Sequence, residues 1–585
     1  MKKSSLAAQL SQLELAKHLR GPGCSVRVEK LLASVRQPRF RDAESLIRFH
    51  DALLFLRAFP QSAGVAQKAE QLLAGLVQEV TRLRKSGAGM DRLDREEFSG
   101  IAGTRLSDSF TYEVTRWLTQ HYPEQVSAAW DFDEQARPMA AVLPRFVPLL
   151  EDDSLVEADT PYPAWMSNAA GEGRELAWLL ERLQDAPIPV AQRTEIYDAL
   201  AVQIHWELGN CRASRTLARR VVPKLFFHQE PLIRRNQVSL AEEFHSPPLL
   251  VRKLTQPEGE DILNMCRDAV TVRYRELYGT TRGDPAQVYE ADAGRGVQIF
   301  FWGLPPDRRL PLRAYHAGFT LKNGVPINYI EGISLFEWME VGFNTFYAYR
   351  DGETAWIYSK ALHFIHQLTG VTCISVYPYQ LGHENDEAIQ SGAFWFYRKL
   401  GFRPGRPELL ALTRKEEQKM AGDPAHRTSA RTLRRLASGH VFYEIGEGPR
   451  GLWDAFSTRN LGFAVQRSMA AKFGGNAEEM RRSTRAILAQ VLNVDLSSWS
   501  PVEKCAFENF AFLLPVTPQL TKWTLAEKQA LLEIIRAKAA PDETVYLHLL
   551  QQHQRLREAV LSLGSAPAAA SPNTKGAKIT LSDGP

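Results

Sequence analysis

The strongest constraint on the fold of this chain is an Asn323-Gly324 pair between two runs of β-forming residues. The runs, 314–321 and 325–330, are rich in aromatic and branched side chains, which favour strands. Asn-Gly favours the left-handed backbone angles of a tight turn, so the two runs are predicted to pair as an antiparallel hairpin. Pro326 has no N–H to donate to a strand ladder, and we expect it at a strand start or on an edge.

Strands and helices alternate on both sides of this hairpin, which indicates a central α+β domain over 248–415. The β-rich runs predict further strands at 251–254, 297–302, 343–349 and 371–377. The helical patterns predict helices at 260–278, from 354 to a stop at Gly370, and from a cap at Asn385 or Asp386 to Leu400. The fold class we expect is α+β, a central mixed sheet with helices, flanked by N-terminal and C-terminal all-α regions.

The flanking regions, 1–247 and 416–563, show apolar residues at the steps of three and four that are typical of helices. One predicted helix face in the first of these regions is formed by Ile196, Leu200, Ile204 and Leu208. The last segment, 564–585, is rich in proline, alanine, serine and glycine. Because such a composition cannot bury a core, this segment is predicted to be a disordered tail.

Charge and composition argue against several function classes. The 585 residues include 71 basic and 67 acidic side chains that are mixed along the chain, for a net charge of +4. No strong electrostatic field for nucleic acid is therefore expected. The chain has no run of about 18 apolar residues that would predict a membrane span, and its amino terminus lacks the pattern of a secretory signal. We expect a cytoplasmic protein that binds neither membranes nor nucleic acid.

Neither the cysteines nor the histidines predict a metal site. The five cysteines lie far apart, with no CxxC pair. His363 and His366 are one helical turn apart, but no third ligand accompanies them at a matching spacing.

Two short motifs carry the chemistry of the central domain. The first is the turn Arg350-Asp351-Gly352-Glu353-Thr354-Ala355, which joins a predicted strand to a predicted helix. A helix that begins directly after a strand points unpaired N–H groups and the positive end of its dipole at the strand end, where a phosphate binds well. The second motif, in the last helix of the domain, consists of Gln390, Ala393, Tyr397, Gly401 and Phe402.

Both motifs resemble those of the GNAT superfamily of acyl-CoA-dependent N-acyltransferases. The first is similar to the family pattern Gln/Arg-x-x-Gly-x-Gly/Ala, and the second to Asn-x-x-Ala-x-x-x-Tyr-x-x-x-Gly-Phe. The resemblance covers about residues 250–415. It implies a GNAT-like mixed sheet and acetyl-CoA or another acyl-CoA as co-substrate. It also implies that the turn at 350–355 holds the pyrophosphate, that Gln390 contacts the cofactor arm, and that Tyr397 protonates the departing thiolate.

The chain departs from the family pattern at two positions. Gln390 replaces an asparagine, and Glu353 stands where the family has its first glycine. A carboxylate at a helix start repels a phosphate, so Glu353 is expected to weaken cofactor binding.

The acceptor amine must lose a proton before or during its attack on the thioester. Glu340, just before the strand that leads to the turn, is the first candidate for this base, followed by Glu337 and His383. His316, Tyr329 and Trp338 are candidates for the lining of the acceptor site.

The sequence therefore predicts an enzyme that moves an acyl group from coenzyme A to an amine by direct attack, without a covalent enzyme intermediate. The acceptor is expected to be a small-molecule or peptide amine, and the helical flanks are candidate surfaces for a protein partner. The alternative is a non-enzymatic helical scaffold or regulatory protein with a degenerate GNAT-like binding module. Glu353 and the large helical flanks favour this alternative, and a cofactor groove filled by Trp356 or Trp395 would support it.

Overall fold

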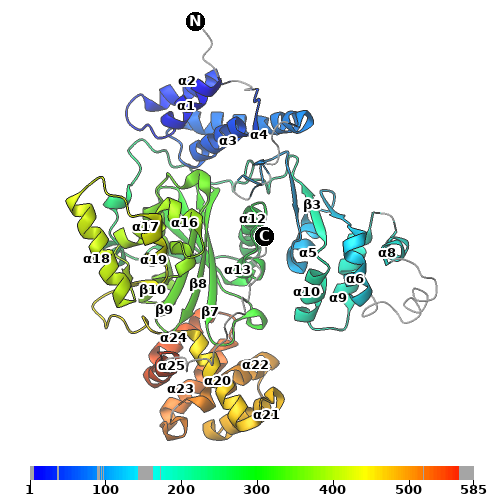
Figure 1. The fold of residues 1–585 in the computed structure, drawn as a ribbon, viewed down its shortest axis with the longest axis vertical. Helices are drawn as coiled ribbons and strands as arrows, with labels where there is room; N and C mark the ends of the chain where they lie inside the picture. Colours follow the sequence, from blue (N-terminus) through cyan, green and yellow to red (C-terminus); the bar gives the residue numbers. More distant parts are fainter. Residues whose placement is uncertain are drawn as a thin grey trace.

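A nine-stranded mixed sheet forms the centre of the molecule (Figure 1). The computed structural model describes residues 6–35, 39–87, 92–93, 95, 98–142, 162–171, 173–517 and 519–565. The sheet has the strand order β11-β12-β10-β9-β8-β7-β6-β5-β4. Its strands are β4 (Leu250–Lys253), β5 (Val288–Gly294), β6 (Val297–Trp302), β7 (Ala314–Lys322), β8 (Val325–Leu335), β9 (Trp338–Thr345), β10 (Cys373–Val376), β11 (Arg403–Pro404) and β12 (Val441–Glu444). The expected class, α+β with a large mixed sheet, is confirmed.

The predicted hairpin is present between β7 and β8. Asn323 and Gly324 form its two-residue turn with φ angles of 51° and 79°, both in the left-handed region. Pro326 is the second residue of β8, next to a break in the β7–β8 register between Thr320 and Leu321. Its position at the strand start is the one that its missing N–H requires.

β9 and β10 form the parallel pair of the sheet, and they separate after a short ladder. The ladder joins Trp338–Glu340 to Cys373–Ser375. β9 then continues to Thr345, whereas β10 ends at Val376 and the chain turns into the short helix α15 (Pro378–Leu381). Proline at the first position of α15 favours this turn, because it disfavours the helical conformation only for the residue before it. The carboxyl-terminal half of β9 thus diverges from its neighbour.

Helices cover both faces of the sheet (Figure 1). α12 (Gln256–Thr271) and α13 (Tyr278–Thr281) lie on one face, where the Trp302 indole N–H donates to the Gly279 carbonyl. α14 (Thr354–Thr369) lies on the other face, where Phe343 of β9 packs against Tyr358. Because side chains alternate along a strand, neighbouring residues of β9 face different helices.

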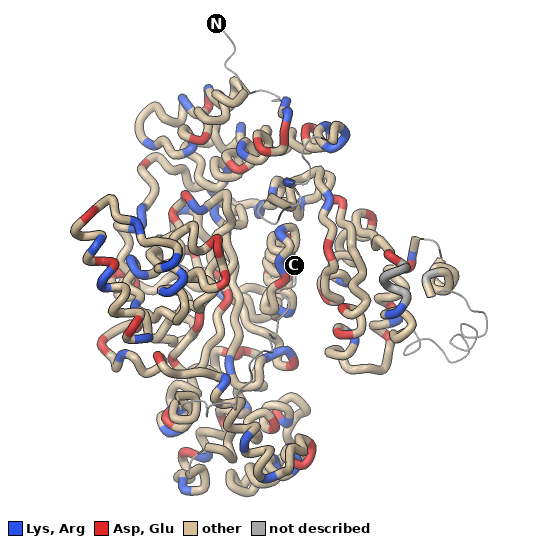
Figure 2. The backbone as a smooth tube through the Cα atoms, in the orientation of Figure 1, with Lys and Arg blue, Asp and Glu red and all other residues tan. Residues whose placement is uncertain are grey.

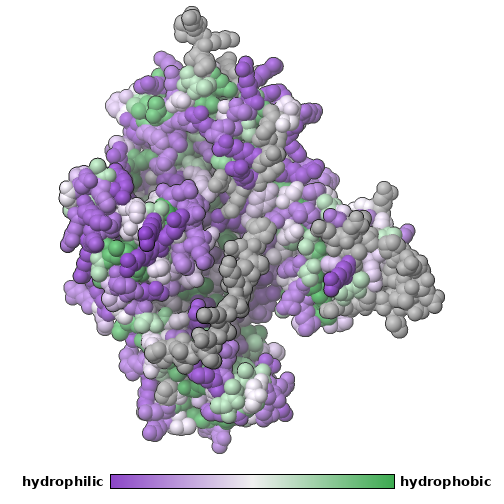
Figure 3. All heavy atoms as spheres, viewed as in Figure 1, coloured by the Kyte–Doolittle hydropathy of each residue, from purple (hydrophilic) through white to green (hydrophobic). Residues whose placement is uncertain are grey.

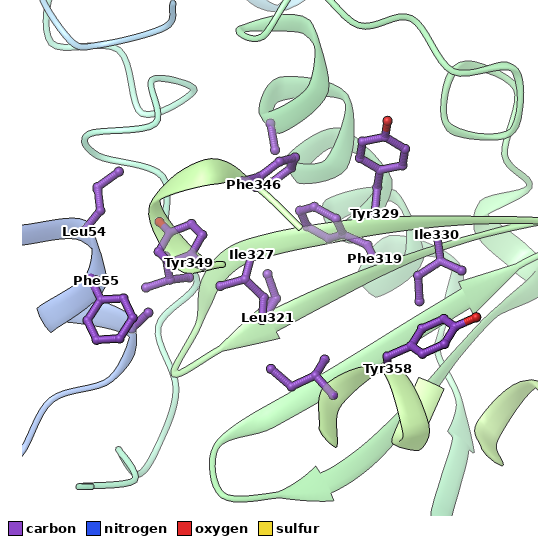
Figure 4. Packing of buried hydrophobic residues seen from close by; sticks show 14 of the residues in the cluster. Leu54, Phe55, Phe319, Leu321, Ile327, Tyr329, Ile330, Phe346, Tyr349 and Tyr358 are labelled. Atoms are coloured by element: carbon purple, nitrogen blue, oxygen red, sulfur yellow. The ribbon is translucent and has the colours of Figure 1, made fainter. Parts of the chain in front are cut away.

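The N-terminal helices share one hydrophobic core with the sheet. These helices are α1 (Leu6–Ala16), α2 (Cys24–Ser34), α3 (Ala43–Ala58) and α4 (Ala63–Ser86). Leu54 and Phe55 of α3 lie on the side of Tyr349, which follows β9 (Figure 4). The tip of the β7–β8 hairpin is held there too, since the Asn323 side-chain amide donates to the Ala58 carbonyl over 2.9 Å.

The expectation that the N-terminal region is all helical is wrong. Residues of this region form a three-stranded antiparallel sheet, in the order β1-β3-β2, within a lobe that has its own core (Figure 1). Its elements are β1 (Arg105–Asp108), α5 (Tyr112–His121), β2 (Val126–Ala129), α6 (Phe132–Val142), α8 (Tyr162–Ala170), α9 (Glu175–Asp185), α10 (Val190–Ala199) and β3 (Gln203–Glu207). The short helix α11 (Leu240–His245) then leads into the central sheet.

The error arose from one ambiguous run of apolar residues. Ile204 and Leu208 are four residues apart and suit a helix, but Trp206 between them is also buried, which is the alternation of a strand. α10 ends at Ala199, and Ala201 takes a left-handed φ of 46° that breaks the helix before β3.

The C-terminal region is not all helical either, because β12 inserts between β10 and β11 of the central sheet. The helices after residue 457 pack around a second core at one end of the sheet, to which Leu335 and Trp338 also contribute, whereas Leu433 and Leu436 belong to the core of the sheet itself (Figure 1). The helices after β11 are α18 (Pro407–Gly422), α19 (Ala430–Leu436), α20 (Thr458–Phe473), α21 (Ala477–Leu492), α22 (Pro501–Leu513), α23 (Leu525–Lys538), α24 (Glu543–Gln552) and α25 (Gln554–Ser565). The predicted tail lies outside the described residues, apart from the last residues of α25.

The helix predicted up to Leu400 is two helices. α16 (Asp386–Ser391) begins after the Asn385 cap, and α17 (Ala393–Lys399) follows it. Gly392 separates them with a φ of 67°, a left-handed conformation that glycine adopts readily. This break changes the direction of the segment that carries Tyr397.

Basic and acidic residues are interspersed along the backbone (Figure 2), and hydrophilic residues cover most of the face in Figure 3. None of the described helices has both the length and the apolar character needed to cross a lipid bilayer.

Candidate functional site

A cavity of about 360 Å³ lies where β9 diverges from β10. We call it the splay cavity. Tyr329 and Asn344 line it from the sheet face that α12 covers, and Phe343 and Tyr397 from the face that α14 covers. The cavity therefore reaches both sides of the sheet, as a site must if two substrates are to meet from opposite sides.

Tyr397 is a buried wall residue of the splay cavity. Its hydroxyl donates to Oε1 of Gln380 over 3.4 Å. Burial raises the pKa of Tyr397 above its ordinary value of 10, so the hydroxyl stays protonated at neutral pH. It can therefore act as a proton donor.

Gln380 occupies the gap between the diverging strands. Its Oε1 also accepts the Phe343 N–H over 3.3 Å, so the hydroxyl of Tyr397 and the N–H of Phe343 converge on a single oxygen atom. Gly342 makes room for this amide, because a Cβ at that position would lie 2.6 Å from the Gln380 Nε2. Two donors that meet on one oxygen are the arrangement that stabilises a carbonyl oxygen as it gains charge.

The predicted turn forms another wall of the splay cavity. Arg350 and Thr354 line it. The Arg350 Nε donates to the Thr345 carbonyl over 3.0 Å, and one of its terminal nitrogens lies 2.5 Å from Glu387. α14 begins at Thr354 without a side-chain cap from Glu353. The Glu353 carboxylate therefore does not lie at the first turn of α14, where the sequence motif would place it.

A second cavity, of about 690 Å³, adjoins the splay cavity at this turn. We call it the turn cavity. The two cavities share Arg350, Thr354 and Phe396. The other charged or titratable residues that line the turn cavity are His18, Arg20, Arg234, Arg235 and Asp351. Four arginines and one aspartate thus surround the start of α14, where the helix dipole is also positive.

Glu353 points away from both cavities. Its side chain is fully buried and bonds to Arg295 over 2.5 Å, and it lies 3.6 Å from the Lys322 Nζ. It also accepts the Ile233 N–H over 3.1 Å, which fixes the segment that carries Arg234 beside the turn. The expectation that this carboxylate faces the phosphate position rested on the motif alone. Instead, Glu353 holds a wall of the turn cavity in place.

The remaining turn residues line the turn cavity to different degrees. Gly352 and Ala355 are wall residues, and Gly352 lies so close to Phe59 that a Cβ there would come within 2.5 Å of its ring. Asp351 also lines the cavity, but its exposed carboxylate pairs with Lys17 over 3.4 Å.

Several other residues singled out in the sequence do not line the splay cavity. Gln390 is exposed on α16. Glu340 lies on β9 but pairs with His440 over 2.9 Å, and Glu337 bonds to Trp453 and Arg557. The other such residues are His316, Trp338, Trp356, His383 and Trp395.

On the α12 face of the sheet, Tyr329 was expected as a lining residue and does line the splay cavity, whereas Arg275, Asn344 and Glu331 were missed. Tyr329 accepts hydrogen bonds from Arg275 over 3.1 Å and from Asn344 over 3.0 Å. Glu331, two residues along β8, lies opposite Gly342 and accepts from the Tyr315 hydroxyl. Burial raises the pKa of Glu331 above its ordinary value. An acidic residue within a mostly apolar strand run is the signal that could have revealed it.

Comparisons with family models, with curated proteins and with solved structures return no significant match. Among the residues that the structure describes, no group of three or more histidine, cysteine, aspartate or glutamate side chains could hold a metal ion. The geometry of the two cavities is therefore what indicates a function for this chain.

Proposed function

We propose that this protein is an acyl-CoA-dependent N-acyltransferase. The observation that carries the proposal is the convergence of the Tyr397 hydroxyl and the Phe343 N–H on one oxygen atom inside the splay cavity. A thioester carbonyl could take the place of the Gln380 amide oxygen once that side chain swings aside. The resemblance of the motifs at 350–355 and 390–402 to the GNAT superfamily supports the same function.

The shared wall of the two cavities supports the proposed cofactor path. A pantetheine arm in the splay cavity would pass Arg350 and Thr354 to reach the turn cavity. There the first turn of α14, Arg234 and Arg235 are suited to the phosphates of coenzyme A. Because Glu353 is turned into a buried ion-pair cluster, it does not repel those phosphates from the cavity wall.

The reaction would run by direct attack. The Phe343 N–H polarises the thioester carbonyl, the amine nitrogen forms a bond to the carbonyl carbon, and the carbon–sulfur bond breaks. Tyr397 gives its proton to the departing thiolate, and the proton lost by the amine restores the phenol. An acceptor that binds as an ammonium ion first gives up another proton before it attacks, and Glu331 is the carboxylate that could accept that first proton, through Tyr315 or a water molecule.

One observation favours the second candidate, a non-enzymatic binding module. Gln380 already satisfies the two donors on which acyl transfer would depend. In that case ligands would enter the turn cavity without reaching Phe343. The two candidates differ in whether acetyl-CoA is turned over or merely bound.

Calorimetry with acetyl-CoA, followed by an assay for thiol release in the presence of an amine panel, tests the proposal. A Thr354→Glu variant puts a carboxylate at the start of α14, inside both cavities, and we expect acetyl-CoA binding to be lost. Ala477→Glu adds the same charge at the exposed start of α21 and should leave binding unchanged. Failure of the native protein to bind acetyl-CoA would overturn the proposal, and binding without thiol release would favour the second candidate.

A further inference from the structure

A third cavity, of about 290 Å³, lies between α5 of the N-terminal lobe and α12 of the central domain. We call it the arginine cavity. Its charged lining residues are Glu113, Arg116, Arg267, Arg275, Arg282 and Arg308. Five guanidinium groups thus surround a small volume whose lining contains a single carboxylate. Neither motif of the central domain contributes to this cavity.

The guanidinium groups are held in place rather than loosely exposed. Glu113 lies 2.8 Å from Arg282 and 3.3 Å from Arg308, and the Arg282 guanidinium lies 4.4 Å from the centre of the Tyr278 ring. Arg267 donates to the Asn264 side chain over 2.9 Å and to the Thr280 carbonyl over 3.3 Å. Such anchoring lowers the entropy that the side chains would lose on gripping a ligand.

The positive charges are also partly withdrawn from water. The side chains of Arg267, Arg282 and Arg308 are 15%, 22% and 31% exposed. Three carboxylates pair with arginines of this five-arginine lining: Glu113 with Arg282 and Arg308, Glu260 with Arg267 over 3.1 Å, and Asp307 with Arg308 over 3.4 Å. Like charges close together in a partly buried site repel each other. An anion in the cavity would relieve that repulsion.

Arg275 connects the arginine cavity to the splay cavity, because it lines both. Within the splay cavity it donates to the Tyr329 hydroxyl over 3.1 Å. A molecule held by the arginines would therefore have its other end close to the position where β9 diverges from β10.

We propose that the arginine cavity binds a carboxylate or phosphate group of a small molecule, and that this molecule is the amine acceptor. Planar guanidinium groups pair with both kinds of anion through two parallel hydrogen bonds. The cavity volume suits a small molecule rather than a folded partner. The binding of an anion stands on the arginine cavity alone, whereas the role of acceptor rests on the proposed acyl transfer.

Calorimetry on the full chain with succinate and with inorganic phosphate as separate probes tests this inference. The double variant Arg116→Gln/Arg308→Gln should weaken binding of the preferred anion by about 10- to 100-fold, since two charged hydrogen-bond donors are removed. The double variant Arg174→Gln/Arg434→Gln makes the same change in net charge at exposed arginines outside the cavity, and should bind the probe like the native protein.

A Glu113→Gln variant tests the inference through a change in anion affinity in the opposite direction. It removes the carboxylate that competes for Arg282 and Arg308, so anion binding should become tighter. A purely structural role for this cluster would produce no such gain. The two probes distinguish a carboxylate from a phosphate ligand.

Three results would overturn the inference: no binding of either probe, equal weakening in both double variants, or no tightening in Glu113→Gln. Tighter binding of a single-stranded oligonucleotide that is lost with Arg116 and Arg308 would also exclude a small-molecule site. Acetyl-CoA binding, measured on the same preparations, tests the proposed function separately. Anion binding without acetyl-CoA binding would retain the anion site and remove its role in acyl transfer.

Discussion

A buried lysine–glutamate pair lies beside each junction between the central sheet and a flanking region, but only one of the two pairs adjoins the candidate site. On the N-terminal side, the Lys322 Nζ lies 3.6 Å from Glu353, which also accepts the Ile233 N–H. On the C-terminal side, the Lys538 Nζ donates to Glu543 over 2.5 Å. Each pair lies within one region and reaches across the junction through a further hydrogen bond. Glu353 accepts the Ile233 N–H on the N-terminal side, and the Lys538 Nζ donates to the Arg313 carbonyl, just before β7, on the C-terminal side.

The two glutamates affect the candidate site differently because they precede different helices. Glu353 directly precedes α14, so the contact that docks the N-terminal side also sets the start of the helix at the turn cavity. Glu543 begins α24, which packs in the separate C-terminal core. The same chemistry can therefore stabilise the fold in both places and shape the candidate site in only one. Variants can separate these two consequences.

The largest effect is expected from Glu353→Gln compared with Glu543→Gln. Each change removes a buried carboxylate from its cations, which are Arg295 and Lys322 at Glu353 and Lys538 at Glu543, so each should lower the free energy of unfolding by about 3–5 kcal/mol. Only Glu353→Gln should also weaken acetyl-CoA binding, because a neutral amide holds the Ile233 N–H less strongly than a carboxylate does and the segment that carries Arg234 loosens. Urea unfolding and calorimetry measure the two quantities. Equal loss of binding in both variants would contradict the distinction between the flanks.

Tyr397→Phe should lower the rate of acyl transfer by about 100-fold with little change in acetyl-CoA binding, since only a proton donor is lost. Tyr358→Phe is the matched control. Tyr358 is buried 5.8 Å from the Tyr397 ring, and no described residue pairs with its hydroxyl. The test compares kcat of Tyr397→Phe with kcat of Tyr358→Phe. If kcat fell by a similar factor in both variants, the effect would come from packing rather than from proton transfer.

Lys322 should make the stability of the N-terminal junction depend on pH. Burial lowers the pKa of Lys322 to about 7, compared with 10.5 in the unfolded chain. Between these values the unfolded chain binds a proton that the folded chain does not, so stability rises with pH. We expect a gain of about 2 kcal/mol between pH 7 and 9.

Lys322→Met should reduce this increase in the free energy of unfolding with pH, and urea unfolding at several pH values measures the increase. An unchanged slope in the variant would show that another group titrates in this range.

A smaller effect is expected from Arg234→Gln/Arg235→Gln. These side chains line the turn cavity at the surface, so acetyl-CoA binding should weaken by about 3- to 10-fold, and less at high salt. Arg481→Gln/Arg482→Gln makes the same charge change on α21 of the C-terminal region. Calorimetry with acetyl-CoA at two salt concentrations compares the two double variants. Equal weakening would point to net charge rather than to the turn cavity.

Local chemistry allowed part of the site to be predicted. The start of a helix at Thr354 and the spacing to Tyr397 follow from short-range patterns, and Arg350, Thr354 and Tyr397 do line one cavity. The strand predicted at 343–349 instead ends at Thr345, and a 3-10 helix at Tyr347–Tyr349 leads into the turn. Gln390 was chosen by the same motif and lies exposed on α16. Gly392 redirects the chain between Gln390 and Tyr397, and periodicity cannot reveal such a break when both halves are helical.

Short-range sequence patterns could not assign a role to Gln380 or to Arg275. Gln380 matters because α15 turns its amide into the gap beside Phe343, and Arg275 because it lies at the junction of two cavities. Both roles depend on the packing of segments that are distant in sequence.

The amino-acid sequence alone was enough to specify the Asn323-Gly324 hairpin, because the dihedral preferences of two adjacent residues decide it. It was also enough to specify the α+β class of the central domain, since hydrophobic periodicity is a local property. Only the tertiary structure decided the direction of Glu353. Its carboxylate is drawn into the protein by Arg295 and Lys322, which come from other parts of the chain. A buried charge takes the orientation that its partners allow, and those partners are brought together only by folding.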